Sequence, residues 1–250
     1  MTLKKQTTAD MPFALVTGAT GDIGEACVKD LVKEGFIVGI HFRTNRDRAE
    51  RILSEIDRRG ILLSADITDT HQVDTLISQI KKDIGRVDVL VNNAGFSINH
   101  LMVAMPLDAF DHQRSLTRGV WYLTKMVLRR FMVRQSMGRI INISSVTAHT
   151  GNAGQVPYTM EKAALDAMTR SLAKELSGRN ILINSVAPGF IDTEMTRYLP
   201  EEVKERIHAS IPLGRVGMPS EVSEVVRFLS VGGNYIQGSV IHVNGGLYAG

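Results

Sequence analysis

Three side chains of the kinds that move protons lie close together in the sequence. A pair of serines ends at Ser145, Tyr158 follows thirteen residues later, and Lys162 comes four residues after the tyrosine. Residues four apart share one face of a helix, so the phenol and the ammonium would be neighbours. A free phenol, with a pKa near 10, keeps its proton at neutral pH, and a nearby ammonium favours the phenolate. The spacing predicts that Tyr158 exchanges a proton beside Lys162 while the Ser145 hydroxyl polarises a carbonyl.

A glycine-rich stretch near the start of the chain is suited to a phosphate group. It runs from Thr17 to Gly24, directly after an apolar run, and leads into a segment with helical periodicity. Small residues let the backbone approach a pyrophosphate, and the first turn of a helix offers N–H groups and a positive dipole end. Ordinary tight turns also need glycine, so this stretch alone is weak evidence. We expect cofactor contacts from Gly18, Thr20, Gly21, Asp22, Ile23 and Gly24.

The residues after the second apolar run indicate which dinucleotide is bound. An acidic side chain there accepts the ribose hydroxyls of NAD, whereas a basic one accommodates the extra phosphate of NADP. The chain has Arg43, Thr44 and Arg46 at this point and no carboxylate before Asp47. We therefore predict NADP(H), with Arg43 as the main phosphate partner, Arg46 second and the Thr44 hydroxyl beside it. The alternative is a solvated arginine loop.

Two later apolar runs end in residues that would extend the same site. A carboxylate follows the third run, where an adenine amino group could meet it, and the fourth run ends in the small-residue turn Asn-Asn-Ala-Gly. Four consecutive runs thus point at one extended ligand. We expect further cofactor contacts from Asp66, Ile67, Asn93, Ala94 and Gly95, together with Tyr158 and Lys162.

The elements that must position these residues alternate along the chain. Short apolar, β-branched runs cover residues 13–17, 37–42, 61–64, 87–92, 139–143, 181–186 and 240–243. Segments with helical periodicity lie between them, at 22–34, 46–59, 70–84, 108–136, 156–177 and 219–230. This alternation predicts an α/β protein: a single Rossmann-type domain over residues 1–250, with a doubly wound parallel sheet of about seven strands and helices on both faces. Ligands then bind at the carboxyl ends of the strands.

Two segments fall outside the alternation. Residues 1–11 are polar, and we expect them to be flexible. Residues 192–218 contain a short helix-like piece between two prolines. An insertion near the binding edge of the sheet suits a lid over a substrate.

Composition excludes several classes of protein. Hydrophobic residues make up 44% of the 250 and charged residues 22%, which is the balance of a folded α/β protein. The 29 basic and 26 acidic side chains leave a formal net charge of +3, too small to indicate nucleic-acid binding. No stretch reaches the roughly 18 apolar residues of a membrane span, and the beginning lacks the apolar run of a signal peptide. We expect a cytoplasmic protein with no membrane partner and no metal site.

Together these motifs resemble the short-chain dehydrogenase/reductase family over essentially the whole chain. The matching features are the loop at 17–24, the turn at 92–95, the residues Ser145, Tyr158 and Lys162, and the segment from Asn184 to Thr193. The resemblance implies catalytic roles for Ser145, Tyr158 and Lys162. It also implies cofactor contacts near the nicotinamide at Pro188, Gly189, Ile191 and Thr193.

Within that family the chain is most similar to the 3-oxoacyl-(acyl carrier protein) reductases. The similarity lies in the Gly-Asn-Ala-Gly-Gln sequence before Tyr158 and in the ending at 238–246. It implies a homotetramer that transfers hydride from NADPH to a 3-oxoacyl thioester, in fatty-acid or polyketide synthesis. One alternative keeps the chemistry but takes another small ketone as substrate.

Two positions depart from the family pattern. The middle glycine of the loop is Asp22 here, and an acidic residue suits the first turn of a helix and could point away from the phosphates. The family's helix asparagine, which holds a proton-relaying water near the lysine, falls on Leu116 or Thr117 depending on the direction of counting. Neither side chain carries an amide, which motivates a second alternative: a non-catalytic subunit of a hetero-oligomer that keeps the reductase fold.

A carrier-protein substrate would need a basic docking surface because carrier proteins are usually acidic. Plain solvated side chains are the alternative. The candidates for docking are Arg129, Arg130, Arg134 and Arg179.

Overall fold

A seven-stranded sheet forms the centre of the protein, whose computed structural model describes residues 11–197 and 201–249. Every pair of neighbouring strands is parallel. The order across the sheet is β3 (Gly60–Ser64), β2 (Ile37–Phe42), β1 (Phe13–Val16), β4 (Val89–Asn92), β5 (Met137–Ile143), β6 (Asn180–Pro188) and β7 (Val240–Val243). The chain winds outward from β1 to β3 and returns to the other side of β1, so the switch in strand order lies between β1 and β4. The predicted α/β fold with about seven parallel strands is confirmed.

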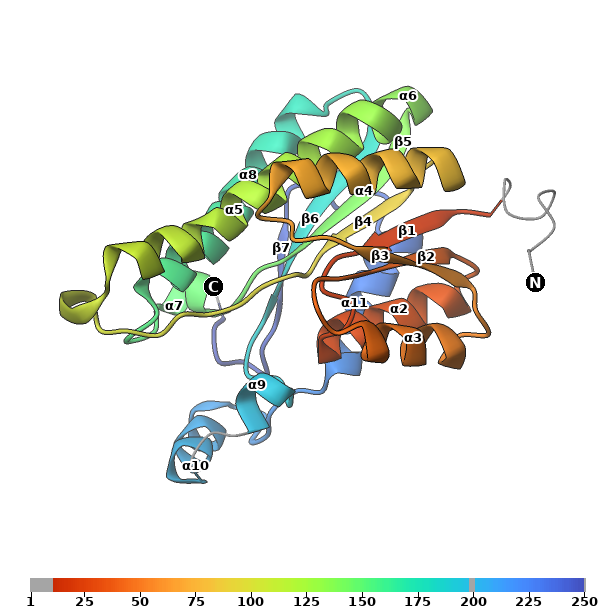
Figure 1. The fold of residues 1–250 in the computed structure, drawn as a ribbon. Coiled ribbons are helices and arrows are strands. Elements are labelled where there is room, and N and C mark those ends of the chain that lie inside the picture. The colour runs from red at the N-terminus through yellow and green to blue at the C-terminus, as the bar shows by residue number, and fades with distance from the viewer. Residues whose placement is uncertain (1–10, 198–200, 250) are drawn as a thin grey trace.

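Helices cover both faces of this sheet (Figure 1). One face carries α2 (Asp22–Lys33), α3 (Arg46–Glu55) and α11 (Pro219–Val231), and the other carries α4 (Thr70–Asp83), α5 (Leu107–Val127) and α8 (Val156–Glu175). Side chains alternate along β1 between the two layers. Phe13 and Leu15 pack in the apolar cluster under α4, α5 and α8, and Ala14 and Val16 in the cluster under α2, α3 and α11.

Shorter elements complete the chain between these layers. They are η1 (Met102–Ala104), η2 (Leu128–Met132), α6 (Val133–Gln135), α7 (Thr147–Thr150), α9 (Glu194–Arg197) and α10 (Glu201–Ser210). The long helix predicted at 108–136 is therefore α5 continued by the π-helical turn η2 and by α6. A close approach seats α5: a Cβ added to Gly119 would lie 2.3 Å from the Ile67 carbonyl oxygen, so only glycine lets the helix contact the loop after β3.

The structure describes only part of the two segments, 1–11 and 192–218, that fall outside the predicted alternation of strands and helices. Residues 1–10 of the predicted flexible end lie outside the described part of the chain, and Met11 packs against the core. In the predicted lid, α9 and α10 project away from the sheet (Figure 1), and residues 198–200 are not described. Among the described helices, none combines the length and the apolar character that crossing a membrane requires.

Candidate active site

A cavity of about 810 Å³ lies at the carboxyl ends of β1 to β6, where the switch in strand order places a ligand site. It is lined by loops from six strands and by the start of α8. Of the predicted residues, those on its wall are Gly18, Thr20, Gly21, Asp22, Ile23, Arg43, Thr44, Asp66, Ile67, Asn93, Ala94, Gly95, Ser145, Tyr158, Lys162, Pro188, Gly189, Ile191 and Thr193. The remaining predicted residue, Gly24, is not part of the cavity wall.

The glycine loop after β1 is packed directly against the loop after β4. A Cβ added to Gly24 would lie 2.3 Å from the Gly18 carbonyl oxygen and 2.7 Å from Asn93 Nδ2. Gly18 itself has a φ of +59°, and a Cβ there would lie 2.8 Å from Ala94 Cα. Asn93 Nδ2 donates to the carbonyl oxygens of Thr17 and Gly18, both at 3.0 Å.

The same loop leaves backbone exposed to the cavity. A Cβ added to Gly21 would meet only the Gly18 carbonyl oxygen, at an ordinary 3.4 Å. Gly21 immediately precedes α2, so the loop presents the N-terminal end of that helix to the cavity. This cradle fits the pyrophosphate of a dinucleotide.

His41, which the motifs did not single out, supports the loop from β2. Its Nδ1 accepts from the Gly18 N–H at 3.1 Å, and its Nε2 lies 3.0 Å from the Ala65 carbonyl oxygen. This pair of partners assigns the ring proton to Nε2. Burial lowers the pKa of His41 to about 4, so the ring is neutral at pH 7. The one available sequence signal was a histidine within an otherwise apolar strand.

This histidine makes stability depend on pH. The ring resists protonation in the folded chain, whereas in the unfolded chain it takes up a proton near pH 6.5, so its contribution is complete above pH 6.5 and is lost as the pH falls towards about 4. The full loss is on the order of 3 kcal/mol, of which about 2 kcal/mol falls between pH 7 and pH 5. Urea unfolding at pH 7 and pH 5, for the native chain and His41→Asn, measures it. The exposed His71→Asn is the matched control, and an equal pH dependence in all three chains would contradict the assignment.

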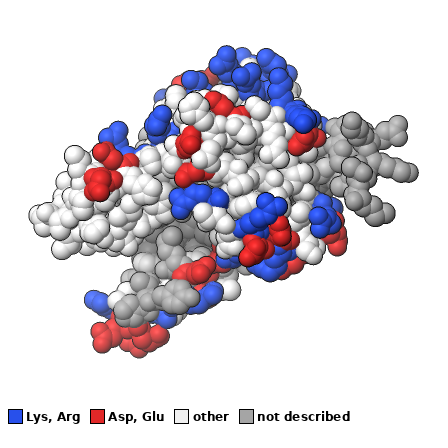
Figure 2. Space-filling model, viewed as in Figure 1, with Lys and Arg blue, Asp and Glu red and all other residues white. Residues whose placement is uncertain are grey.

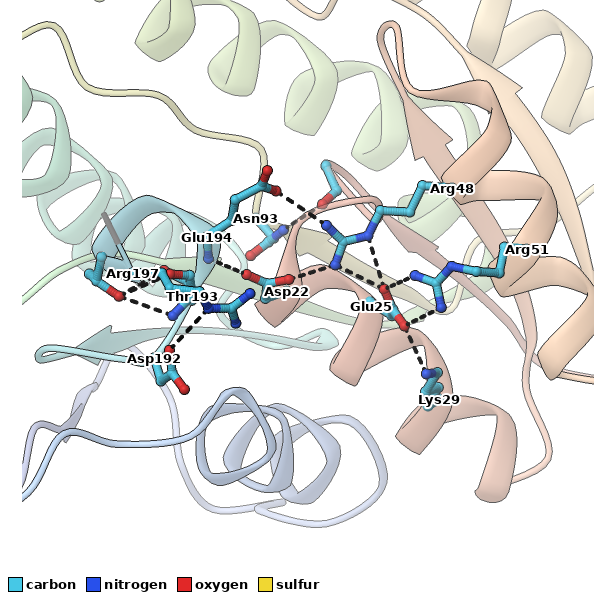
Figure 3. Close-up of polar contacts among 12 residues, drawn as sticks. Asp22, Glu25, Lys29, Arg48, Arg51, Asn93, Asp192, Thr193, Glu194 and Arg197 are labelled. Carbon is cyan, nitrogen blue, oxygen red and sulfur yellow. Dashed lines mark hydrogen bonds and ion pairs between the residues drawn. The ribbon is translucent and has the colours of Figure 1, made fainter. Parts of the chain in front are cut away.

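Asp22 links the glycine loop to two other elements (Figure 3). Its carboxylate accepts from Arg48 of α3 at 2.5 Å and from the backbone N–H of Glu194 in α9 at 2.6 Å. Arg48 also donates to Glu25 at 3.0 Å. Partial burial would raise the pKa of Asp22, but the bonds from Arg48 and from the Glu194 N–H outweigh it and lower the pKa below its ordinary value. The acidic residue in the loop is thus bound to α3 and α9.

At the ends of β2 and β3, basic and acidic side chains share the edge of the cavity. The Arg43 guanidinium is exposed, with Nη1 3.8 Å from Asp66 Oδ2. Asp66 accepts from the Thr68 hydroxyl at 2.7 Å, which fixes its carboxylate. Arg46 instead donates to Glu50 at 2.8 Å and is not part of the cavity wall. Of the two predicted phosphate partners, Arg43 is the one placed on the cavity.

Ser145, Tyr158 and Lys162 meet at the end of β5. Lys162 is buried, its Nζ donates to the Ile143 carbonyl oxygen at 3.0 Å, and it lies 5.5 Å from the centroid of the Tyr158 ring. Ser145 Oγ accepts from the Thr147 N–H at 3.2 Å and from the Thr147 hydroxyl at 3.0 Å. A serine oxygen that accepts twice still has its own proton to donate. The arrangement provides an O–H donor, a phenol and an ammonium around one space.

The family model described as enoyl-(acyl carrier protein) reductase matches residues 18–248 of the chain. The chain belongs to the short-chain dehydrogenase/reductase family. As a member it is an oxidoreductase that uses a nicotinamide cofactor.

Curated relatives support this membership. The chain is 42% identical over 239 residues to the 3-oxoacyl-(acyl-carrier-protein) reductase FabG of Haemophilus influenzae, covering 94% of this chain and 98% of that protein. The FabG proteins of Aquifex aeolicus and Pseudomonas aeruginosa are each also 42% identical, with 94% of this chain and 96% of the relative covered.

The two candidate positions for the short-chain reductases' helix asparagine differ in where they lie. Of the two candidates, Leu116 is buried and lines the cavity, whereas Thr117 is half-buried and is not part of the wall. Of the two, Leu116, the residue reached by counting back from Gly119, is the one that faces the cavity.

The four arginines predicted as a docking surface lie at the other edge of this short-chain reductase fold. Arg129 and Arg130 are on η2 and Arg134 is on α6, which leads into the amino end of β5, and Arg179 directly precedes the amino end of β6. All four are exposed. Figure 2 shows basic side chains gathered at the top of the view, where Figure 1 has α6. The cavity opens at the carboxyl ends of the strands, so these arginines do not border it.

Proposed function

We propose that this short-chain reductase transfers hydride from NADPH to the 3-carbonyl carbon of a 3-oxoacyl thioester, carried by acyl carrier protein or CoA, and forms the 3-hydroxyacyl thioester. The observation that carries the proposal is the meeting of Ser145, Tyr158 and Lys162 in one cavity with the glycine loop and Arg43. The names of the curated relatives supply the substrate class. Fatty-acid or polyketide synthesis is the process in which such a product forms.

The residues on the wall fit NADP(H). The loop at Gly18–Gly24 would hold the pyrophosphate, Arg43 and Thr44 the additional phosphate, and Asp66 the adenine side. The remaining contacts would come from Ile67, Asn93, Ala94, Gly95, Pro188, Gly189, Ile191 and Thr193. When bound, the nicotinamide supplies the hydride.

The chain's own residues then handle the carbonyl oxygen. The Ser145 hydroxyl would donate to it and polarise the C=O bond. As the carbon gains hydride, the oxygen becomes an alkoxide, and Tyr158 transfers its phenolic proton to that oxygen. The Lys162 ammonium, held by the Ile143 carbonyl, stabilises the phenolate that is left.

Carrier-protein docking through Arg129, Arg130, Arg134 and Arg179 would serve the cavity of a second copy, because these side chains are at the opposite edge from the cavity of their own chain. The expected homotetramer would bring such a second copy alongside. Exposed apolar side chains support association, with Trp121 of α5 51% exposed and Phe228 of α11 47% exposed. We further propose that the chain is one domain and that residues 192–218, whose first part lines the cavity, form its substrate lid.

Loss of NADPH absorbance with three substrates tests the function. We expect turnover with acetoacetyl-CoA and with a longer 3-oxoacyl carrier-protein thioester, and turnover at least roughly tenfold slower with the matched free ketone, because the thioester carrier adds binding energy. Faster turnover of the free ketone would indicate a different substrate class.

A second candidate function follows from Leu116, which gives the cavity no polar group where the family has an amide. In that case the chain is a non-catalytic subunit. Tight NADPH binding without turnover of any of the three ketones would favour it.

A further inference from the structure

A buried carboxylate lies beside the lysine of the candidate active site, and the roles assigned above do not use it. Glu161 is 4% exposed, on the turn of α8 between Tyr158 and Lys162. Its Oε1 lies 3.8 Å from Lys162 Nζ. A charged group is costly to remove from water, so a carboxylate in this place needs partners.

Gln113 of α5 holds this carboxylate. Its Nε2 donates to Glu161 Oε2 and, at 3.0 Å, to the Phe96 carbonyl oxygen, while its Oε1 accepts from the Ile98 N–H at 2.9 Å. Gln113 is itself completely buried. Both ends of its amide are therefore bound to the loop after β4, which fixes the carboxylate relative to the cavity wall.

The lysine ammonium has three N–H groups, of which the Ile143 carbonyl takes one. Leu116 offers it no polar atom from α5. Among the described residues, Glu161 provides the carboxylate that comes within 4 Å of Lys162 Nζ. Burial raises the pKa of Glu161, against the effects of Lys162 and Gln113. Both side chains are buried, so this lysine–carboxylate contact is shielded from solvent.

Other titratable groups face this region from neighbouring elements. On α5, Asp111, His112 and Arg114 flank Gln113 and are exposed. One turn further along α8, Asp166 is buried, accepts from Ser144 Oγ at 2.9 Å and lies 3.1 Å from His149 Nε2 of α7. Asp166 thus has its own partners.

We propose that Glu161, held by Gln113, is a positioning residue for Lys162: a buried counter-ion that fixes the ammonium beside Tyr158 and sets the pH at which tyrosine and lysine together release a proton. The proposal rests on the proposed function in assigning Tyr158 and Lys162 to proton transfer.

Removing the negative charge has a predictable sign. With Glu161→Gln the amide oxygen can still accept from Gln113, but the ammonium is no longer neutralised and its field favours the phenolate more strongly. The tyrosine and lysine should then release their proton at lower pH, by about one unit, the lower end of the range for an opposite charge at such distances.

The first readout needs no substrate. The chain has five tyrosines, so the ultraviolet difference titration of tyrosinate is recorded for the native chain minus Tyr158→Phe, and again for both in the Glu161→Gln background. We expect the Tyr158 midpoint to move to lower pH in the second pair. Glu175→Gln, an exposed glutamate on the same helix, is the matched control and should leave the midpoint in place.

The second readout is turnover. Glu161→Gln should lower kcat about tenfold and move the basic limb of its pH profile to lower pH, while Glu161→Asp, which keeps the charge, recovers part of the loss. Because the tyrosinate titration does not depend on turnover, a chain that reduces no thioester overturns the proposed function and still tests this inference.

Gln113→Met approaches the same pair from the other helix. It removes the donor that fixes the Glu161 carboxylate relative to Lys162, so the pair loosens and the tyrosinate midpoint should move in the same direction. If the folded variants, as judged by circular dichroism and Tm, titrate as the native chain does, Glu161 is not a counter-ion for Lys162 and the proposal is overturned. If Glu161→Gln does not fold, the tyrosinate midpoint of the Gln113→Met variant tests the proposal in its place.

Discussion

Tyr158→Phe is expected to reduce turnover of a 3-oxoacyl thioester by about 10³-fold, the contribution of a positioned proton donor. The variant keeps the aromatic ring whose centroid lies 5.5 Å from Lys162 Nζ and removes only the phenolic O–H. NADPH binding should therefore be unchanged. The rate of NADPH oxidation measures turnover, and NADPH fluorescence measures binding. Together they separate a loss of proton transfer from a loss of cofactor binding.

Tyr122→Phe is the matched control for this prediction. Its phenol donates to Asp74 at 2.9 Å between α5 and α4, and the residue is not on the cavity wall. We expect turnover close to native. If Tyr158→Phe keeps native turnover, another group donates the proton and the catalytic assignment fails.

Arg43→Glu should weaken NADPH binding roughly 100-fold and leave NADH binding nearly unchanged, because a hydrogen bond to a charged phosphate is worth about 1.5–3 kcal/mol. The substitution removes the exposed guanidinium at the cavity edge and, under the proposed function, places a repelling carboxylate where the 2′-phosphate of NADPH would lie. Dissociation constants for both dinucleotides measure it. Arg46→Glu, which disrupts the pair with Glu50 off the cavity, should change neither by more than a few-fold. Equal weakening of NADPH and NADH would show that Arg43 does not read the phosphate.

The fold could be predicted because each strand is a compact apolar run with polar or small residues at its end. Residues 37–42 and 240–243 have the predicted bounds, and the other strands differ by a few residues at their ends. The convergence of the glycine loop, Arg43, Ser145 and Tyr158 on one cavity follows from parallel strands that all end at one edge.

Contacts between distant side chains could not be predicted in the same way. Nothing local to Asp22 indicates that Arg48 and the Glu194 N–H will bind it, because that depends on how α3 and α9 lie against the loop. Glu161 reads as a surface glutamate until α5 is placed over it with Gln113. The sequence shows that Arg129, Arg130, Arg134 and Arg179 are all basic. Only the direction in which β5 and β6 run shows that these arginines lie away from the cavity.

One carboxylate, that of Asp22, joins the glycine loop to α3 and to the start of residues 192–218. Thermodynamic linkage makes such a junction reciprocal: a ligand that favours one arrangement of the loop biases the following segment by the same free energy, and the reverse holds equally. Where a bound dinucleotide prefers one arrangement of this junction, occupancy of the glycine loop and the arrangement of residues 192–197 become coupled quantities. An affinity measured at the glycine loop would then report on the segment after β6 as well.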